Sequence, residues 1–387
     1  MEKIFTVIAS FFIMLCLGGV YSWSIFVPEL KNSFNFSSFQ TQVIFSILIA
    51  IFPITMIFAG RLEKKFSVKI LCVISAIFFS FGYLLSGFSG GNFWIMLLGM
   101  GIFTGIGTGF GYLAALTAPV KAFPEKKGLV TGIAAAGFGL ASVVLSPLAK
   151  FLLDKGFNVL NVFNIVGISY GMIILLFAFL INSSTQAKEE KPIKPFEFLK
   201  ETSLYKLFTG LFLGTFAGLL IVGSLRPIGA EGGIDVNFLV LGVSVFSIAN
   251  FLGRLFWGFV SDYLGSSLTI FIALAFQAVS IFLMGNISLD PMVYLILSFF
   301  IGFGFGSNFV LFARETSQIF GVKNLGVIYP YVFLGYSLGG IFGPSIGGFL
   351  HDVSKSYILG INIAAFLSFV GGILFLVNHF QMKGRKT

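Results

Sequence analysis

The chain has 387 residues, of which 57% are hydrophobic and only 10% are charged, and its mean hydropathy is +1.00. A water-soluble core cannot absorb so much apolar surface, so the composition excludes an ordinary soluble domain and predicts that membrane lipid surrounds most of the chain. The net charge of +9 is then expected to reflect basic loops on one side of a membrane, and not binding to nucleic acid.

Continuous apolar runs recur along the chain at lengths that suit membrane-crossing helices. A helix needs about 20 apolar residues to cross a hydrocarbon core about 30 Å thick, and backbone groups in lipid must be satisfied internally. Because these runs do not alternate with polar residues, we predict an all-α membrane protein with about twelve transmembrane helices. They are expected near residues 4–28, 38–59, 68–88, 91–119, 127–150, 157–182, 204–228, 237–261, 267–288, 290–313, 324–350 and 356–379.

The lysines and arginines are distributed unevenly between the loops. With the N-terminus in the cytoplasm, 18 of the 24 fall on the cytoplasmic side, five on the outer side, and Arg254 inside a span. This bias predicts a multi-pass protein of the cell (inner) membrane with both termini cytoplasmic. The longest polar segment carries charges and two prolines, and it predicts a cytoplasmic linker, 183–203, between an N-terminal half, 1–182, and a C-terminal half, 204–387.

The two halves resemble each other when the chain is shifted along itself. A shift of 198 residues places Gly60 on Gly258 and Asp154 on Asp352, and four further matches occur at this offset or one residue less. We therefore predict a duplication that gives two pseudo-symmetric six-helix halves around a central site, which is the plan of many secondary transporters.

Arg254 interrupts a run that has no other charge from Val236 to Ser261. Counting from Ser261 at 1.5 Å per residue puts it roughly 10 Å inside the membrane, where insertion of a cation costs about 2.5–3.5 kcal/mol. It could snorkel to the headgroups, pair with a buried acid, bond helix-end carbonyls, or face a water-filled cavity and an anionic ligand. The last interpretation is favoured, because no acid lies within the other predicted spans and a guanidinium offers a planar fork that fits a carboxylate. Asn250, one turn earlier on the same face, is expected to add an amide donor.

Five stretches, in this order along the chain, resemble the oxalate/formate antiporter branch of the major facilitator superfamily, which is close to the monocarboxylate transporters. They are "GGVYSWSIF" (18–26), "GYLAALTAPVKAFPEKKGLVTGIAAAGFG" (111–139), "FLGTFAGLLIVGSLRPIGAEGG" (212–233), "GRLFWGFVSDYLG" (253–265) and "FGVKNLGVIYPYVFLGYSLGGIFGPSIGG" (320–348). The resemblance covers nearly the whole chain and implies the major facilitator fold with transport by alternating access.

The resemblance also implies a role for particular residues. The family holds the substrate carboxylate with an arginine in the eighth span, and Arg254 occupies that place. The oxalate exchanger adds a lysine in the eleventh span, where this chain has Tyr336. Two cations suit a dianion such as oxalate, whereas one cation and a hydroxyl suit a monoanion, so this departure favours lactate-, pyruvate- or acetate-like substrates.

Four more aromatic residues are candidates for the substrate site. Tyr112 in "GFGYLA" and, more weakly, Tyr21 in "GVYSW" could reach a carboxylate or a 2-hydroxy group from the N-terminal half. Each could equally pack against a neighbouring helix with its hydroxyl bonded locally. Phe309 and Phe333 are expected to form apolar walls, although they are two among 52 phenylalanines.

The loop "GFVSDYLG", from Gly258 to Gly265, fits the superfamily's glycine-x-x-x-aspartate-x-x-glycine pattern. The two glycines would let helices approach closely and turn sharply. Asp262 is expected to cap the cytoplasmic start of the eleventh span, or to pair with Arg314 near the end of the tenth and so hold a gate shut; an ordinary loop aspartate is the alternative. The equivalent loop of the first half lacks this aspartate, and the sequence leaves open whether Glu63 replaces it.

These features together predict a monomeric secondary transporter for a small monocarboxylate, coupled to a co-transported proton. Anion exchange of the oxalate/formate type is the alternative, and efflux of hydrophobic drugs and a non-transporting membrane sensor are remote alternatives. No nucleotide loop, metal-ligand cluster or catalytic triad stands out, so we expect neither an enzyme nor a site for a cofactor or metal ion. Glu29 and Glu315, near the membrane edges, are weak candidates for the proton-carrying group, and the substrate could carry the proton instead.

Overall fold

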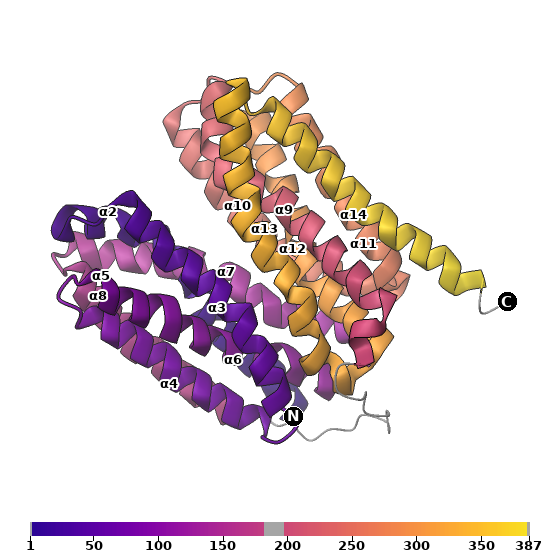
Figure 1. The fold of residues 1–387 in the computed structure, drawn as a ribbon, viewed down its shortest axis with the longest axis horizontal. Helices are drawn as coiled ribbons and strands as arrows, with labels where there is room; N and C mark the ends of the chain where they lie inside the picture. Colours follow the sequence, from indigo (N-terminus) through magenta and orange to yellow (C-terminus); the bar gives the residue numbers. More distant parts are fainter. Residues whose placement is uncertain (1, 182–196, 385–387) are drawn as a thin grey trace. The chain divides into compact units, whose positions relative to one another are not determined.

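The computed structural model describes residues 2–181 and 197–384, and these residues are largely helical (Figure 1). Among them, twelve helical segments are long and apolar enough to cross a membrane, which confirms the number predicted from hydropathy. Most of the predicted linker falls in residues 182–196, outside the described residues. Its end forms a short 3-10 helix, η3, at Glu197–Lys200.

The chain divides into two compact units. Unit 1 comprises residues 1–125 and 133–189, and unit 2 comprises residues 126–132 and 190–387. The beginning of the fifth span therefore groups with unit 2 while the rest of the same helix groups with unit 1, a division that the sequence does not indicate.

Unit 1 contains the first six spans except for the start of the fifth. Two of these spans are not single regular helices. A 3-10 segment at Gly18–Ser22 interrupts the first span, and a π-helical segment at Leu97–Phe103 interrupts the fourth. Such irregular turns are frequent near functional sites. The elements are α1 (Glu2–Leu17), η1 (Gly18–Ser22), α2 (Trp23–Phe34), α3 (Ser38–Leu62), α4 (Val68–Gly87), α5 (Phe93–Met96), η2 (Leu97–Phe103), α6 (Thr104–Ala122), α7 (Lys127–Asp154) and α8 (Val159–Ala178).

Unit 2 contains the last six spans. Its main helix pairs are α9 with α13, α10 with α12, and α11 with α14. The elements are α9 (Thr202–Glu231), α10 (Val236–Leu264), α11 (Ser266–Asn286), α12 (Pro291–Phe320), η4 (Val322–Asn324), α13 (Leu325–Ser354) and α14 (Ile358–Gly384).

The helices of the two units correspond at the offset seen in the sequence. Helices α10, α11 and α13 begin 198 residues after α3, α4 and α7 respectively. The packing corresponds as well, because α3 packs against α6 as α10 packs against α12, and α4 packs against α8 as α11 packs against α14. This agreement supports the internal duplication predicted from the sequence.

Helices α10 and α12 of unit 2 extend beyond their predicted ends, and this changes the position of charged residues. Helix α10 continues to Leu264, so Arg254 lies ten residues, or roughly 15 Å, from the end of the helix. Helix α12 continues to Phe320, so Arg314 and Glu315 are helical residues, both of them buried. The expectation that no acid lies within the spans is therefore wrong, because Glu315 belongs to α12.

Candidate functional site

Arg254 is almost completely buried, with only 1% of its surface exposed, compared with 8% for Arg314. Its Nε donates a hydrogen bond to Oδ1 of Asn250, one helical turn earlier, at 3.0 Å. Its Cζ lies 4.1 Å from the centroid of the Phe309 ring, within the range of a cation–π contact. The guanidinium plane is thus fixed on one edge by an amide and on one face by an aromatic ring.

Asn250 makes a contact that the sequence did not predict. Its amide oxygen accepts the hydrogen bond from Arg254, and the expected role of its NH2 group as a donor to the ligand stays a prediction. The contact holds Nε, and a carboxylate binds a guanidinium in a bidentate manner through adjacent N–H groups. Asn250 is therefore placed to orient the arginine.

Phe309, the aromatic contact of this arginine, belongs to a group of aromatic side chains within unit 2. The ring of Phe309 (α12) meets the ring of Tyr336 (α13) edge-on at 5.4 Å and that of Phe333 at 6.3 Å. Tyr336 and Phe333 stack on each other at 5.0 Å. Five of the seven predicted substrate-site residues, from three helices, therefore form one connected group.

The close packing of α10 on α12 places Phe309 over the arginine. Gly306 makes this packing possible, because a Cβ on it would lie 2.4 Å from the carbonyl oxygen of Asn250 and 3.0 Å from the backbone nitrogen of Arg254. Sequence reasoning missed Gly306, although its spacing of four residues from Gly302 is a pattern typical of close helix contacts in membranes.

The other two predicted residues, Tyr21 and Tyr112, belong to a second aromatic group in unit 1. Phe138 of α7 contacts both of them edge-on, at 5.3 Å from Tyr21 and 5.1 Å from Tyr112. Phe52 of α3 lies 5.0 Å from Tyr112. Sequence reasoning missed Phe52 and Phe138, yet the internal repeat could have found them.

The repeat relates two members of the unit 1 group to members of the unit 2 group. Phe138 lies 198 residues before Tyr336, and Phe52 lies 198 residues before Asn250. The two units thus share one aromatic position, Phe138 and Tyr336, whereas position 56, which corresponds to Arg254, is a methionine.

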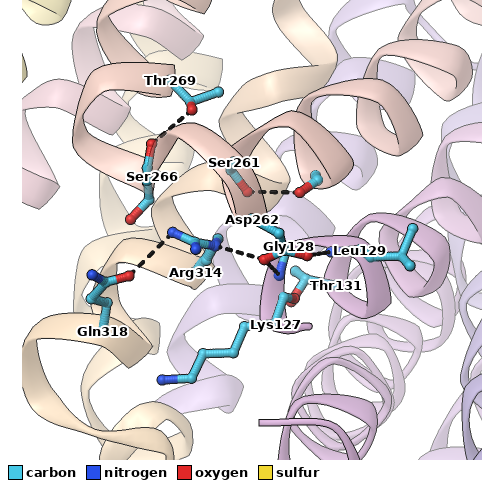
Figure 2. Close-up of polar contacts among 12 residues, drawn as sticks. Lys127, Gly128, Leu129, Thr131, Ser261, Asp262, Ser266, Thr269, Arg314 and Gln318 are labelled. Atoms are coloured by element: carbon cyan, nitrogen blue, oxygen red, sulfur yellow. Dashed lines mark hydrogen bonds and ion pairs between the residues drawn. The ribbon is translucent and has the colours of Figure 1, made fainter. Parts of the chain in front are cut away.

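Asp262 is the centre of a second polar cluster, at the end of α10 (Figure 2). Its Oδ1 accepts a hydrogen bond from Nε of Arg314 at 3.0 Å, so the ion pair expected from the sequence is present. The two carboxylate oxygens also accept hydrogen bonds from the backbone N–H groups of Gly128 and Leu129, each at 2.9 Å. The carboxylate thus caps the first turn of α7 (Figure 2).

The helix that Asp262 caps is not the one expected. The sequence predicted the start of the eleventh span, and the structure shows the start of the fifth. The repeat explains the difference. Helices α7 and α13 are equivalent in the two halves, and the loop that contains Asp262 contacts the start of α7. A negative charge at a helix N-terminus is stabilising, typically by about 0.3–1 kcal/mol at exposed sites.

Gly258 and Gly265 have the structural roles that the loop pattern predicts. A Cβ on Gly258 would lie 2.5 Å from the carbonyl oxygen of Gly128, so this glycine allows α10 to approach the first turn of α7. Gly265 has φ of +80°, a backbone conformation that favours glycine, and it forms the turn between α10 and α11.

Glu315 follows Arg314 in α12 and is 1% exposed. Its carboxylate accepts hydrogen bonds from the hydroxyl groups of Ser266 and Ser267, the first two residues of α11. Arg314 and Glu315 therefore hold the two sides of the α10–α11 turn, through Asp262 and through the two serines. Glu315 is thus a buried carboxylate near the end of α12, held by the first turn of α11.

Glu63 forms a comparable but separate contact in unit 1. Its Oε1 accepts a hydrogen bond from Nζ of Lys121 in α6 at 2.7 Å, and also one from the hydroxyl of Thr117. The sequence left open whether Glu63 replaces the aspartate that the first-half loop lacks. Glu63 pairs with a cation of the fourth span, as Asp262 pairs with a cation of the tenth.

Comparison with known proteins agrees with this architecture. The sequence profile of the Major Facilitator Superfamily matches residues 6–240 and 207–386. The oxalate:formate antiporter of Oxalobacter formigenes is 28% identical over 352 residues, which cover 89% of this chain and 84% of the relative. Monocarboxylate transporter 13 of Bos taurus is 22% identical over 377 residues, which cover 95% of this chain and 87% of the relative.

A solved structure shows the same fold. The crystal structure of the transporter FucP in the outward conformation superposes with a TM-score of 0.77 at 18% identity, covering 97% of this chain and 99% of that one. These proteins are membrane transporters and not enzymes. Since the family profile spans nearly all of the sequence, the chain belongs to the major facilitator superfamily and is a multi-pass secondary transporter.

Proposed function

We propose that this transporter carries a small monocarboxylate, of the lactate, pyruvate or acetate class, and that Arg254 binds the carboxylate group. The observation that supports this most is the buried guanidinium, which Asn250 orients through a hydrogen bond and which lies over the Phe309 ring. A fixed cation in a low-dielectric site attracts an anion far more strongly than the same cation does in water. The names of the relatives, an oxalate:formate antiporter and a monocarboxylate transporter, point to the same class of substrate.

The proposal is tested by uptake into proteoliposomes. Labelled lactate, pyruvate, acetate, formate and oxalate are supplied separately, and empty liposomes correct for passive entry of the neutral acids. We expect saturable uptake of monocarboxylates and weaker uptake of oxalate. Uptake of hydrophobic cations with no carboxylate uptake would contradict the proposal and favour drug efflux.

Tyr336 provides a prediction about substrate charge. It stacks on Phe333 beside Phe309, the residue that contacts Arg254. We expect Tyr336→Lys to shift selectivity from monoanions toward oxalate, by about tenfold or more in the ratio of the two uptake rates, because a second cation suits a dianion. Competition of oxalate against labelled lactate measures this ratio.

The matched control is Tyr336→Phe, which keeps the stacked ring and removes only the hydroxyl. It should leave the ratio of oxalate to lactate uptake within about twofold of the wild type if the added charge is what changes selectivity. An unchanged ratio in Tyr336→Lys, in a variant that still takes up lactate, would remove Tyr336 from the site.

We further propose that transport is coupled to protons, with exchange of two anions as the second candidate. The similarity to the oxalate:formate antiporter specifically favours the second candidate. A counterflow assay separates them, because an exchanger needs substrate on the far side of the membrane. A symporter instead accumulates lactate when a pH gradient alone is imposed.

The cluster around Asp262 is proposed to be a latch of the transport cycle. The first turn of α7 is held by the carboxylate, and the rest of α7 belongs to unit 1. Release of this turn would therefore free one helix shared by the two units, as alternating access requires. A transporter of this kind would act as a monomer in the cell membrane with both termini in the cytoplasm.

A further inference from the structure

A cavity lies at one end of unit 2, away from Arg254 and Asp262 in the sequence and on different helices. Its volume is about 370 Å³. It is formed by the end of α9, the end of α11, the loop that follows α11, and the start of α14. The side chains that line it are mostly apolar, including Ile228, Met284, Leu289, Ile358 and Ile361.

A carboxylate and an aromatic ring stand among these apolar side chains. Glu231 is exposed, and its Oε2 accepts a hydrogen bond from the backbone N–H of Tyr357 at 3.1 Å. A carboxylate has about four acceptor positions, so this bond leaves capacity for another donor. Tyr357 also lines the cavity, and its ring stacks on His351 at 4.2 Å.

Two carboxylates act on the Tyr357 hydroxyl at this cavity. Burial raises the pKa of the Tyr357 hydroxyl above its ordinary value, and the negative charges of Glu231 and Asp352 raise it further. The hydroxyl therefore stays neutral at physiological pH. A cation placed here would be attracted by Glu231 and by the face of an aromatic ring.

The cavity also lies at the ends of three candidate membrane spans. Glu231 ends the seventh candidate span, Asn286 ends the ninth, and Ile358 begins the twelfth. Tyrosines are common at the ends of spans because one end of the side chain is apolar and the other is polar. A ligand that enters here can place its charged part at the span ends and its apolar part along the helices.

We propose that this cavity binds the headgroup of a phospholipid with a primary ammonium, that is, a phosphatidylethanolamine. The ammonium donates a hydrogen bond to Glu231 and lies near the Tyr357 ring, and the glycerol and upper acyl chain cover Ile228, Met284 and Ile361. Primary ammonium is favoured over choline, because a quaternary ammonium has no N–H to donate. An anionic headgroup would be repelled by Glu231. This inference is independent of the substrate proposed above.

The test is competition among lipids for the purified full-length protein. The protein is reconstituted with equal amounts of phosphatidylethanolamine, its mono- and dimethyl derivatives, phosphatidylcholine and phosphatidylglycerol, all with the same acyl chains, and the retained lipids are measured by native mass spectrometry. We expect retention to fall along the methylation series and phosphatidylethanolamine to exceed phosphatidylcholine by about two- to fivefold, as suits one partly exposed ionic hydrogen bond.

Glu231→Gln should abolish this preference while keeping the fold, since glutamine retains an oxygen for the Tyr357 N–H. Asp235→Asn is the matched control, because Asp235 is another carboxylate beside the end of α9 that also accepts a backbone N–H, from Asn237. It should keep the preference. Equal retention of all five lipids by the wild type, or an unchanged preference in Glu231→Gln, would overturn the proposal. Displacement of the lipid by an equal concentration of free ethanolamine would overturn it too, because the cavity would then be a site for a soluble amine.

Discussion

Replacing Arg254 with alanine is expected to reduce the uptake of monocarboxylates by about 100-fold or more, because the carboxylate loses its charge-assisted, bidentate hydrogen bonds in a buried site. Arg254→Lys should be impaired nearly as strongly. A lysine keeps the charge, but it lacks the planar fork, and it cannot reproduce both the Asn250 contact and the stacking on Phe309. The measurement is the initial rate of labelled lactate uptake into proteoliposomes with matched protein content.

Arg226→Ala is the control for this variant. Arg226 is an exposed arginine in α9, so its removal takes away the same functional group from a site outside the aromatic group. We expect its uptake to be near that of the wild type. Size-exclusion profiles of all three variants show whether each is folded. Wild-type uptake in a folded Arg254→Ala variant would exclude this arginine from the substrate site.

Replacing Asp262 with alanine is expected to have the second largest effect. It removes the ion pair with Arg314 and both hydrogen bonds to the α7 N-terminus, which together contribute about 2 kcal/mol or more to the closed latch. The equilibrium between closed and open latch should move by roughly 30-fold. The result should be slower lactate uptake and greater exposure of the first turn of α7.

Exposure can be measured with a cysteine placed at Leu129, next to the capped N–H groups. Both native cysteines, Cys16 and Cys72, are buried and free, so they interfere little with labelling by a charged maleimide. Labelling of Leu129→Cys should be faster in the Asp262→Ala background than with native Asp262. Asp235→Asn provides the control, because that aspartate caps α10 itself by an equivalent contact. Equal labelling rates in both backgrounds would contradict the latch.

A charge exchange distinguishes the two functions of Asp262. In the double variant Asp262→Arg with Arg314→Asp, an ion pair can form again, but an arginine now faces the positive end of α7. We expect the double variant to remain defective in uptake, since helix capping needs an acceptor at position 262. Recovery of uptake to the wild-type rate would show that the ion pair alone is sufficient.

The sequence predicts the spans well because hydropathy is a local property. It places all twelve, and most boundaries agree within a few residues. The largest error is at α12, which was predicted to end near residue 313 and ends at Phe320. The polar residues there, Arg314 and Glu315, resemble a loop in sequence, but they are buried within unit 2 by partners from α10 and α11.

The sequence predicts less about contacts between distant residues. The pairing of Asp262 with Arg314 was correct because opposite charges at the ends of two spans suggest a contact. The prediction of which helix Asp262 caps was wrong. Nothing in the local sequence distinguishes the start of α7 from the start of α13, its equivalent in the repeat. Phe138 was missed among 52 phenylalanines, although its equivalent, Tyr336, was selected for its hydroxyl.

We propose that the carboxylate of the substrate binds the terminal nitrogens of Arg254. A crystal structure with bromoacetate tests this most directly, since the anomalous signal of bromine locates the ligand without ambiguity. We expect the carboxylate within about 3 Å of the terminal nitrogens of Arg254, with the Asn250 amide oxygen still bound to Nε. Bromine density remote from α10, together with an aspartate or glutamate bound to the Arg254 guanidinium, would contradict it.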